Sequence, residues 1–379
     1  MKQKQLLHTP EGVRDLYGKE YAKKLKLQDD LMKGIQLYGY ENIQTPTFEF
    51  FDVFSEEIGT TSSRELYKFF DKEGNTLVLR PDFTPSMARC AAKYFMDKEV
   101  PIRFCYSGNT FINNSNLQGK LKELTQMGAE LIGDNSVYAD AEMIMMVIDT
   151  LRSAGLTKFQ VTVGEVEYFK GICHHAGLDC DTEMALRDYI SEKNFFAAEE
   201  LMLEKGISER DREAILQVRE FYEVEKTLTK ARELAPNDRS RSAIARLEEL
   251  YELLKQYGVS EYVSFDLGML SKFHYYTGVI FKAYTYGVGD AIVTGGRYDT
   301  LLGRFGKDAP AIGFMVLIDD LMEALYRQGI CVDVEEKRQS IYYNKDNYAE
   351  KLTKAIELRK QGVFVSMLPD AYESANKEN

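Results

Sequence analysis

The sequence predicts an α+β fold, in which an antiparallel sheet flanked by helices carries a helical insertion and a short C-terminal α/β fragment. Strand-like runs joined by turn residues recur before residue 165 and again from residue 263. Between them, residues 181–257 are rich in Glu, Lys, Leu and Ala at helical spacing, with one break at 236–238. We therefore expect a core over residues 1–330 with an insertion at about 173–260, and an α/β remnant over 335–379.

The N-terminal region predicts a helix followed by an exposed strand. Residues 18–37 form an amphipathic pattern that ends before Gly39, with its apolar positions on one face: Tyr21, Leu25, Leu27, Leu31 and Ile35. The extended stretch 41–51 contains Pro46, which lacks the N–H that an inner strand needs. We therefore expect an edge or interface strand there.

The rest of the chain alternates between strands and helices. Turn residues between 66–70 and 76–79 predict a hairpin. Further strands are expected at 102–110, 123–132, 159–164, 279–284 and 291–293. Helices are expected at 83–95 and 139–154, and 311–325 is a buried segment that leads into a helix. The C-terminal part predicts a strand, a helix and a strand at 341–343, 348–360 and 363–367.

Composition limits the possible partners and compartments. The net charge is −12, so most of the surface repels a phosphate backbone and tight non-specific nucleic-acid binding is not expected. No apolar run reaches the roughly 18 residues of a membrane span, and residues 1–10 do not form a signal peptide. The cysteines are odd in number and irregularly spaced, which favours reduced thiols in a cytoplasm: Cys90, Cys105, Cys173, Cys180 and Cys331.

Two cysteines near a histidine pair raise the question of a metal site. Cys173, His174, His175 and Cys180 do not have the spacing of a common structural zinc site. We expect a loop before the helical insertion here and no metal.

Five short segments together resemble histidyl-tRNA synthetases, a class II aminoacyl-tRNA synthetase family. The resemblance covers about residues 8–325, and its segments are 9–15, 79–85, 124–133, 274–278 and 294–299. Each segment is weak alone, but their order and spacing are specific. The resemblance implies the class II sheet and a site for histidine.

The resemblance also implies which residues would hold the amino acid. Asp82, Thr84 and Gln126 match the positions that hold its ammonium group, which carboxylate, hydroxyl and amide oxygens can accept. Glu130 and the tyrosines match the positions around the imidazole ring, namely the pair Tyr275 and Tyr276 together with Tyr298.

The catalytic arginines of the family are missing at the matching positions. The family uses them to stabilise charge that develops when ATP is attacked. Here those positions hold Ile112, Ser271 and Asp320, so no catalytic residue is predicted. Ser271 replaces an arginine that would touch the ligand carboxylate, a contact that Lys272 could supply.

Residues 9–15 and 79–84 are more similar to a branch of this family, the regulatory subunits of ATP phosphoribosyltransferase. This resemblance implies a non-catalytic subunit that joins short catalytic subunits in a hetero-octamer, enables them and relays feedback inhibition by histidine. It implies no tRNA and no cofactor. The motif 1 match at the N-terminal helix and the Pro46 strand implies a self-dimer.

Two other functions remain open from the residues. A divergent synthetase would need arginines from elsewhere, such as Arg103 or Arg304. A scaffold protein would keep the fold without binding a ligand.

Overall fold

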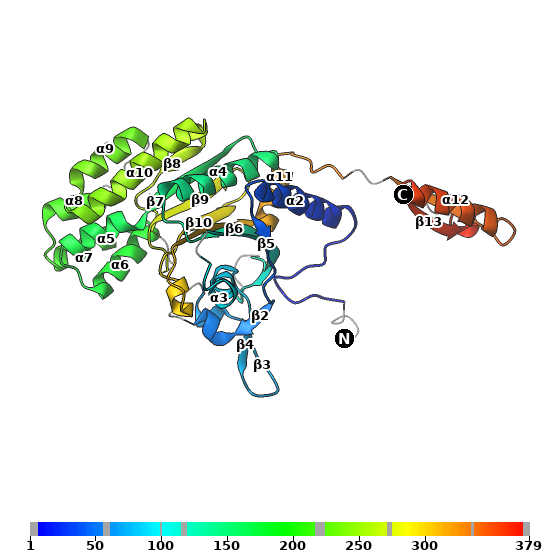
Figure 1. Cartoon of the computed structure of the whole chain (residues 1–379), viewed down its shortest axis with the longest axis horizontal. Helices are drawn as coiled ribbons and strands as arrows, with labels where there is room; N and C mark the ends of the chain where they lie inside the picture. The colour runs from blue at the N-terminus through cyan, green and yellow to red at the C-terminus, as the bar shows by residue number, and fades with distance from the viewer. Residues whose placement is uncertain are drawn as a thin grey trace.

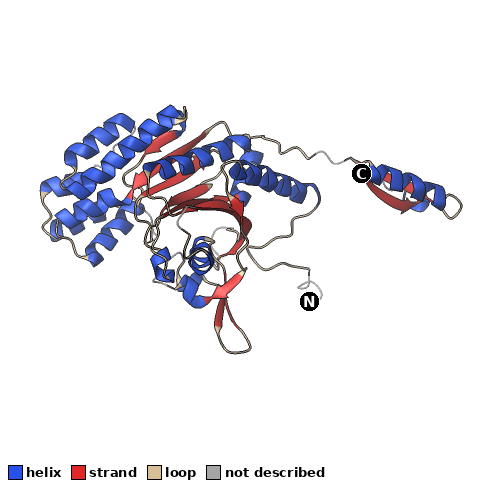
Figure 2. Cartoon of the chain, viewed as in Figure 1, coloured by secondary structure: helices blue, strands red, loops and turns tan. Residues whose placement is uncertain are grey.

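The structure is a computed structural model that describes residues 7–55, 61–98, 101–114, 120–216, 224–270, 275–334 and 337–373. Its centre is an eight-stranded sheet (Figures 1 and 2). The strands, in spatial order, are β1 (Glu41–Asn42), β5 (Ile102–Phe111), β6 (Glu123–Ile132), β11 (Ala311–Leu317), β10 (Val293–Arg297), β9 (Val279–Thr285), β7 (Phe159–Glu165) and β8 (Val263–Phe265).

The predicted antiparallel sheet is confirmed for the six inner strands, whereas the short edge strands β1 and β8 run parallel to their neighbours. The predicted helices are present as α2 (Gly18–Gln36), α3 (Thr84–Tyr94), α4 (Val137–Ser153) and α11 (Ile318–Arg327). Each predicted boundary is within a few residues of the observed one.

The two faces of the sheet carry separate apolar cores. Side chains alternate along a strand, so Met127, Ala129 and Leu131 of β6 face one way and pack with α2 and α4. The other face carries Tyr106 and Tyr298, which pack with α3. The second face therefore has aromatic hydroxyls close to the strands, and the cavity described below opens there.

A three-stranded sheet projects from the second face. Strand β2 (Phe48–Phe50) forms one edge, next to the hairpin of β4 (Thr76–Leu79) and β3 (Lys68–Phe70). The predicted strand over 41–51 is divided around Pro46 into β1 and β2, and each lies at the edge of its own sheet. The predicted hairpin is confirmed. Four phenylalanines of this sheet are exposed to solvent: Phe48, Phe50, Phe69 and Phe70.

The helical insertion begins earlier than the sequence pattern suggests. Its helices, at the left of Figure 1, are α5 (Val166–His175), α6 (Cys180–Ser191), α7 (Phe195–Glu204), α8 (Glu209–Leu216), α9 (Val224–Leu234) and α10 (Asp238–Gln256). The expectation of a loop at Cys173 is wrong, because Cys173 is buried in α5. The apolar residues of α5 follow β7 directly, which conceals the boundary in the sequence.

The C-terminal residues form a small unit that stands apart from the large sheet (Figure 1). Strands β12 (Arg338–Tyr343) and β13 (Phe364–Pro369) pair in parallel, and α12 (Tyr348–Lys360) packs on both. The predicted strand, helix and strand are all present.

Candidate functional site

A cavity of about 700 Å³ opens on the second face of the sheet, between α3 and the strands β5, β6, β10 and β11. Its wall includes all seven residues that the sequence predicts for amino-acid binding: Asp82, Thr84, Gln126, Glu130, Tyr275, Tyr276 and Tyr298. They come from four separate parts of the chain, which the fold brings together.

Strand β6 supplies two of these side chains, because its side chains point alternately to the two faces of the sheet. Gln126 and Glu130 are four residues apart, so they face the cavity together while the odd-numbered residues face the other core. Both are nearly fully buried.

Glycines make room for these side chains. A Cβ atom on Gly313 would lie 1.6 Å from Glu130 Oε2, and one on Gly296 would lie 2.7 Å from the ring of Tyr276. A Cβ on Gly128 would lie 2.6 Å from Tyr106 Oη. The cavity therefore depends on three strand positions that have no side chain. Of the Gly295–Gly296 pair, only Gly296 lines the cavity, whereas Gly295 faces the other core, where a Cβ would lie against the ring of Phe281.

The carboxylate of Glu130 lies at the base of the cavity and is held by two hydroxyl groups. Thr84 Oγ1 donates to Oε1 at 3.0 Å and Tyr298 Oη donates to Oε2 at 2.5 Å. Burial raises the pKa of Glu130 to about 8, although both hydroxyl donors oppose this shift. No Lys or Arg among the described residues that line the cavity neutralises this group.

A second acidic group lies at the start of α3. Asp82 accepts hydrogen bonds from the backbone N–H groups of Phe83 and Thr84, at 2.6 and 3.4 Å. Burial raises the pKa of Asp82 to about 6, while these two N–H groups hold it down. The cavity thus contains two carboxyl groups and suits a ligand that brings positive charge or N–H donors.

The tyrosines form the aromatic side of the cavity. The rings of Tyr275 and Tyr276 are 4.6 Å apart, and Tyr298 meets Tyr275 edge to face at 6.0 Å. All three are buried. A flat ring of a ligand can pack here while Glu130 and Tyr298 supply polar partners.

The sequence analysis did not identify Tyr106 as part of this site. Tyr106 is buried on β5, and its ring stacks on Phe83 at 4.3 Å. Among the described residues, neither Tyr106 Oη nor Gln126 Oε1 has a hydrogen-bond partner. Both residues line the cavity, so a ligand there could satisfy these atoms. The only sequence signal for Tyr106 was its place in a strand.

The outer part of the cavity is neutral to acidic. It is lined by Thr61, Ser62, Glu65, Ile112 and Asn114, together with Thr294 and Met315. The structure thus places Ile112 in the cavity wall.

The other two positions that match family arginines, Ser271 and Asp320, are not among the described residues of the cavity wall. Ser271 is outside the described residues. Asp320 is in the first turn of α11 and is not among the residues that line the cavity. Its neighbour Asp319 explains this: it binds Lys24 Nζ at 2.7 Å and the backbone N–H of Thr125 at 2.7 Å, and so fixes the start of the helix behind β6.

The arginines that a divergent synthetase could use are also elsewhere. Arg103 forms an ion pair with Glu142 of α4, on the far side of the sheet. Arg304 is in a short helical turn outside the cavity wall.

Comparisons with known proteins agree with this geometry. The family model described as histidyl-tRNA synthetase matches residues 12–321. The ATP phosphoribosyltransferase regulatory subunit of Acetivibrio thermocellus is 39% identical over 95% of this chain and 86% of that protein. The corresponding subunit of Clostridium kluyveri is 35% identical over 98% of this chain and 97% of that protein. This chain belongs to the ATP phosphoribosyltransferase regulatory subunit family.

Solved structures support the same family. A Bacillus halodurans structure described as an ATP phosphoribosyltransferase regulatory subunit/histidyl-tRNA synthetase has a TM-score of 0.87 and 33% identity. The match covers 97% of this chain and 93% of the Bacillus halodurans chain. Histidyl-tRNA synthetase from Nostoc, with a TM-score of 0.80 at 18% identity over 98% of this chain and 89% of that one, shows the shared class II fold.

Within the described ranges, no three His, Cys, Asp or Glu side chains come together to hold a metal ion. None of the described helices has the length and apolar character of a membrane span.

Proposed function

We propose that this chain is a non-catalytic regulatory subunit that binds histidine in the cavity and controls a short catalytic subunit of ATP phosphoribosyltransferase. Membership of the regulatory subunit family supports the catalytic partner. The observation that carries the histidine proposal is the contrast within one cavity. Its base holds carboxyl, amide and tyrosine groups, whereas its described wall has no Lys or Arg to stabilise a reacting phosphate.

Histidine fits the base of the cavity chemically. Its ammonium group would lie against Asp82, Thr84 and Gln126 Oε1, which are acceptors. Its imidazole ring would pack among the tyrosines with one ring nitrogen on Glu130. Glu130 already accepts from Thr84 and Tyr298, but the described wall gives it no cation. An imidazole ring that shares a proton with the carboxyl group would supply that charge.

Reconstitution tests the function directly. Phosphoribosyl-ATP formation by the short catalytic subunit from the same source is measured with and without this chain, and then with histidine. The proposal expects activity that requires this chain and falls when histidine is added. Activity that is indifferent to this chain would reject the regulatory role.

The match to the histidyl-tRNA synthetase model makes a divergent synthetase the second candidate. Such an enzyme needs cationic groups at the α-phosphate, and the described wall supplies none. ATP–pyrophosphate exchange with histidine by the isolated chain separates the two candidates. Robust exchange would favour the synthetase.

We further propose that the chain self-associates through α2 and the β2–β4 sheet. Exposed aromatic residues gather on this sheet: Phe48, Phe50, Phe69 and Phe70. Tyr21 and Leu25 of α2 are also exposed. Apolar surface of this kind is typical of protein contacts. A dimer at micromolar concentration in sedimentation, and a hetero-octamer with the catalytic subunit, are expected. A monomer would contradict the first expectation.

A further inference from the structure

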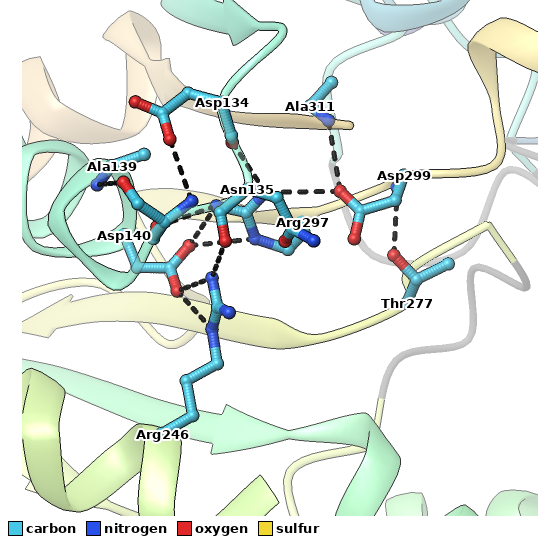
Figure 3. A network of polar contacts seen from close by, with 10 residues as sticks. Asp134, Asn135, Ala139, Asp140, Arg246, Thr277, Arg297, Asp299 and Ala311 are labelled. Carbon is cyan, nitrogen blue, oxygen red and sulfur yellow. Dashed lines mark hydrogen bonds and ion pairs between the residues drawn. The ribbon is translucent and has the colours of Figure 1, made fainter. Parts of the chain in front are cut away.

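A buried ionic network lies directly behind the cavity, on the opposite face of β10 (Figure 3). Arg297 is the last residue of β10 and Tyr298 is the next residue of the chain. Their side chains leave the backbone on opposite sides. Tyr298 faces Glu130, whereas Arg297 faces α4 and binds Asp140.

Arg297 has a partner for every guanidinium nitrogen. Its Nε and Nη2 donate to Asp140 Oδ1 at 2.9 and 2.5 Å. Its Nη1 donates to the carbonyl oxygen of Asp134 at 2.9 Å and to Asp299 Oδ1 at 3.2 Å. Arg297 is 2% exposed and Asp140 is fully buried, so this arrangement is rigid and well shielded from solvent.

The same network fixes the backbone next to two of the cavity tyrosines, Tyr276 and Tyr298. Thr277, which follows Tyr276, donates its N–H to the carbonyl of Arg297 at 2.9 Å, and its hydroxyl accepts from the N–H of Asp299 at 2.9 Å. Asp299 Oδ1 also accepts from the N–H of Ala311 at 3.1 Å. Tyr298 donates its own N–H to the carbonyl of Ala311 at 2.7 Å. A shift of Arg297 therefore moves the segments that carry Tyr276 and Tyr298.

Among the described residues of the helical insertion, Arg246 is the side chain that hydrogen-bonds to this network. Arg246 of α10 donates from Nε to Asp140 Oδ2 at 2.6 Å, and from Nη2 to the carbonyl of Asn135 at 3.1 Å. Asp140 thus bridges two arginines, one from the insertion and one from the sheet. About a quarter of the Arg246 side chain is exposed, and α10 is held mainly by its buried apolar residues: Ala243, Ile244, Leu247, Leu250 and Leu254. Removal of Arg246 should leave the fold intact.

We propose that Arg246 is a positioning residue that couples the helical insertion to the cavity through Asp140 and Arg297. This inference rests on the proposed function for its ligand, histidine. It makes the affinity of the cavity depend on how α10 is seated against α4. Because coupling between two sites is reciprocal, a partner that displaces α10 would change histidine affinity, and histidine would change the affinity for that partner by the same factor.

The test compares Arg246→Leu and Arg246→Lys with Arg241→Leu. Arg241 lies on the same helix, pairs with the exposed Asp238 and has no link to Asp140. The matched control therefore removes the same charge from the same helix. Hydrogen exchange of the backbone N–H groups of residues 294–299 is measured without ligand, and histidine affinity is measured by calorimetry.

Arg246→Leu is expected to accelerate exchange at residues 294–299 and to weaken histidine binding roughly five- to tenfold. Arg246→Lys should restore most of both, and Arg241→Leu should match the wild type. Unchanged exchange, or unchanged affinity with only a lower Tm, would overturn the inference and leave Arg246 a stabilising residue. If the wild type binds no histidine, the proposed ligand fails, whereas the exchange result still decides whether Arg246 positions the cavity strand.

Discussion

Two buried carboxylates on opposite sides of the central sheet differ in how their charge is balanced. Asp140 lies between Arg297 and Arg246, so the chain itself supplies its counter-ions. Glu130 lies between two hydroxyl groups, and no cation among the described residues lines its cavity. A carboxylate whose charge is balanced within the fold stabilises structure. A buried carboxyl group that lacks a cation is either protonated or available to bind a ligand that brings positive charge.

The largest effect is expected from a change at Asp140, whose charge two arginines balance, and it should appear in the free energy of unfolding. Asp140→Asn removes the charge between two arginines and leaves Arg297 buried with only Asp299 as a carboxylate partner. The free energy of unfolding should fall by about 3–5 kcal/mol, because an uncompensated buried charge is costly. Urea unfolding at neutral pH measures this loss.

The control for this variant is Asp238→Asn, which breaks the pair with Arg241 on the surface of α10. Exposed ion pairs contribute little, so its unfolding curve should resemble that of the wild type. Equal losses in the two variants would contradict the distinction between the buried network and a surface pair.

A change at Glu130 should lower histidine affinity without lowering the free energy of unfolding. Glu130→Gln keeps the shape of the side chain but removes the acceptor charge, so histidine affinity should fall by about 10- to 100-fold. The free energy of unfolding should stay the same or rise at pH 8, since the variant no longer ionises a buried carboxyl group. Calorimetry and urea unfolding measure the two quantities.

Glu123→Gln is the matched control, since it makes the same change on the same strand. Its carboxylate accepts from Asn109 at 2.7 Å and is not part of the cavity wall. It should leave histidine affinity unchanged. A Glu130→Gln protein that binds histidine as tightly as the wild type would remove Glu130 from the site.

The dependence of histidine affinity on pH sharpens the same comparison. The pKa of Glu130 is raised to about 8, and a free imidazole titrates near 6.5. A complex in which the ring faces Glu130 holds one proton between them. Below about pH 6.5 the free partners hold two protons and must release one on binding, whereas above about pH 8 they hold none and must take one up.

From the Glu130–imidazole pair alone, affinity should be level between about pH 6.5 and 8 and fall by up to about tenfold per pH unit on either side. Protonation of Asp82, whose pKa burial raises to about 6, should steepen the decrease on the acid side. The Glu130→Gln variant, measured in parallel, should lose the decrease above pH 8 because it has no carboxyl group to protonate. A wild-type profile above pH 8 that matches the variant's would show that Glu130 does not share a proton with the ligand.

The sequence predicted much of the fold because its signals are local. Alternation placed Gln126 and Glu130 on one face of a strand, and Pro46 marked an edge. The start of the insertion could not be read, because α5 is apolar and directly follows β7.

Roles that depend on partners far away in the chain could not be predicted from the sequence either. Arg246 is one of many charged residues in a helix of ordinary composition, and only its contact with Asp140, 106 residues away, distinguishes it. The network around Arg297 likewise joins segments from α4, α10 and β10. Such contacts depend on tertiary packing, which no local pattern specifies.

The smallest effect on histidine affinity is expected from a change at Tyr106. This test adds a neutral hydroxyl group to the comparison of Asp140 with Glu130. Its hydroxyl is buried in the cavity wall without a partner among the described residues, while the rest of the ring is held by Phe83. Tyr106→Phe keeps this stacking and removes only the hydroxyl. If histidine uses the hydroxyl, affinity should fall about two- to tenfold, the effect of one neutral hydrogen bond.

The stability of the unliganded Tyr106→Phe protein should hold or rise slightly, because an unpaired buried hydroxyl costs free energy. Tyr168→Phe is the control: Tyr168 Oη donates to the carbonyl of Ala231 at 3.3 Å, away from the cavity. This control should lose stability by about 1 kcal/mol and keep full affinity. If Tyr106→Phe instead loses stability and keeps affinity, its hydroxyl belongs with Asp140 among the groups that the fold satisfies, and Tyr106 is not a ligand contact.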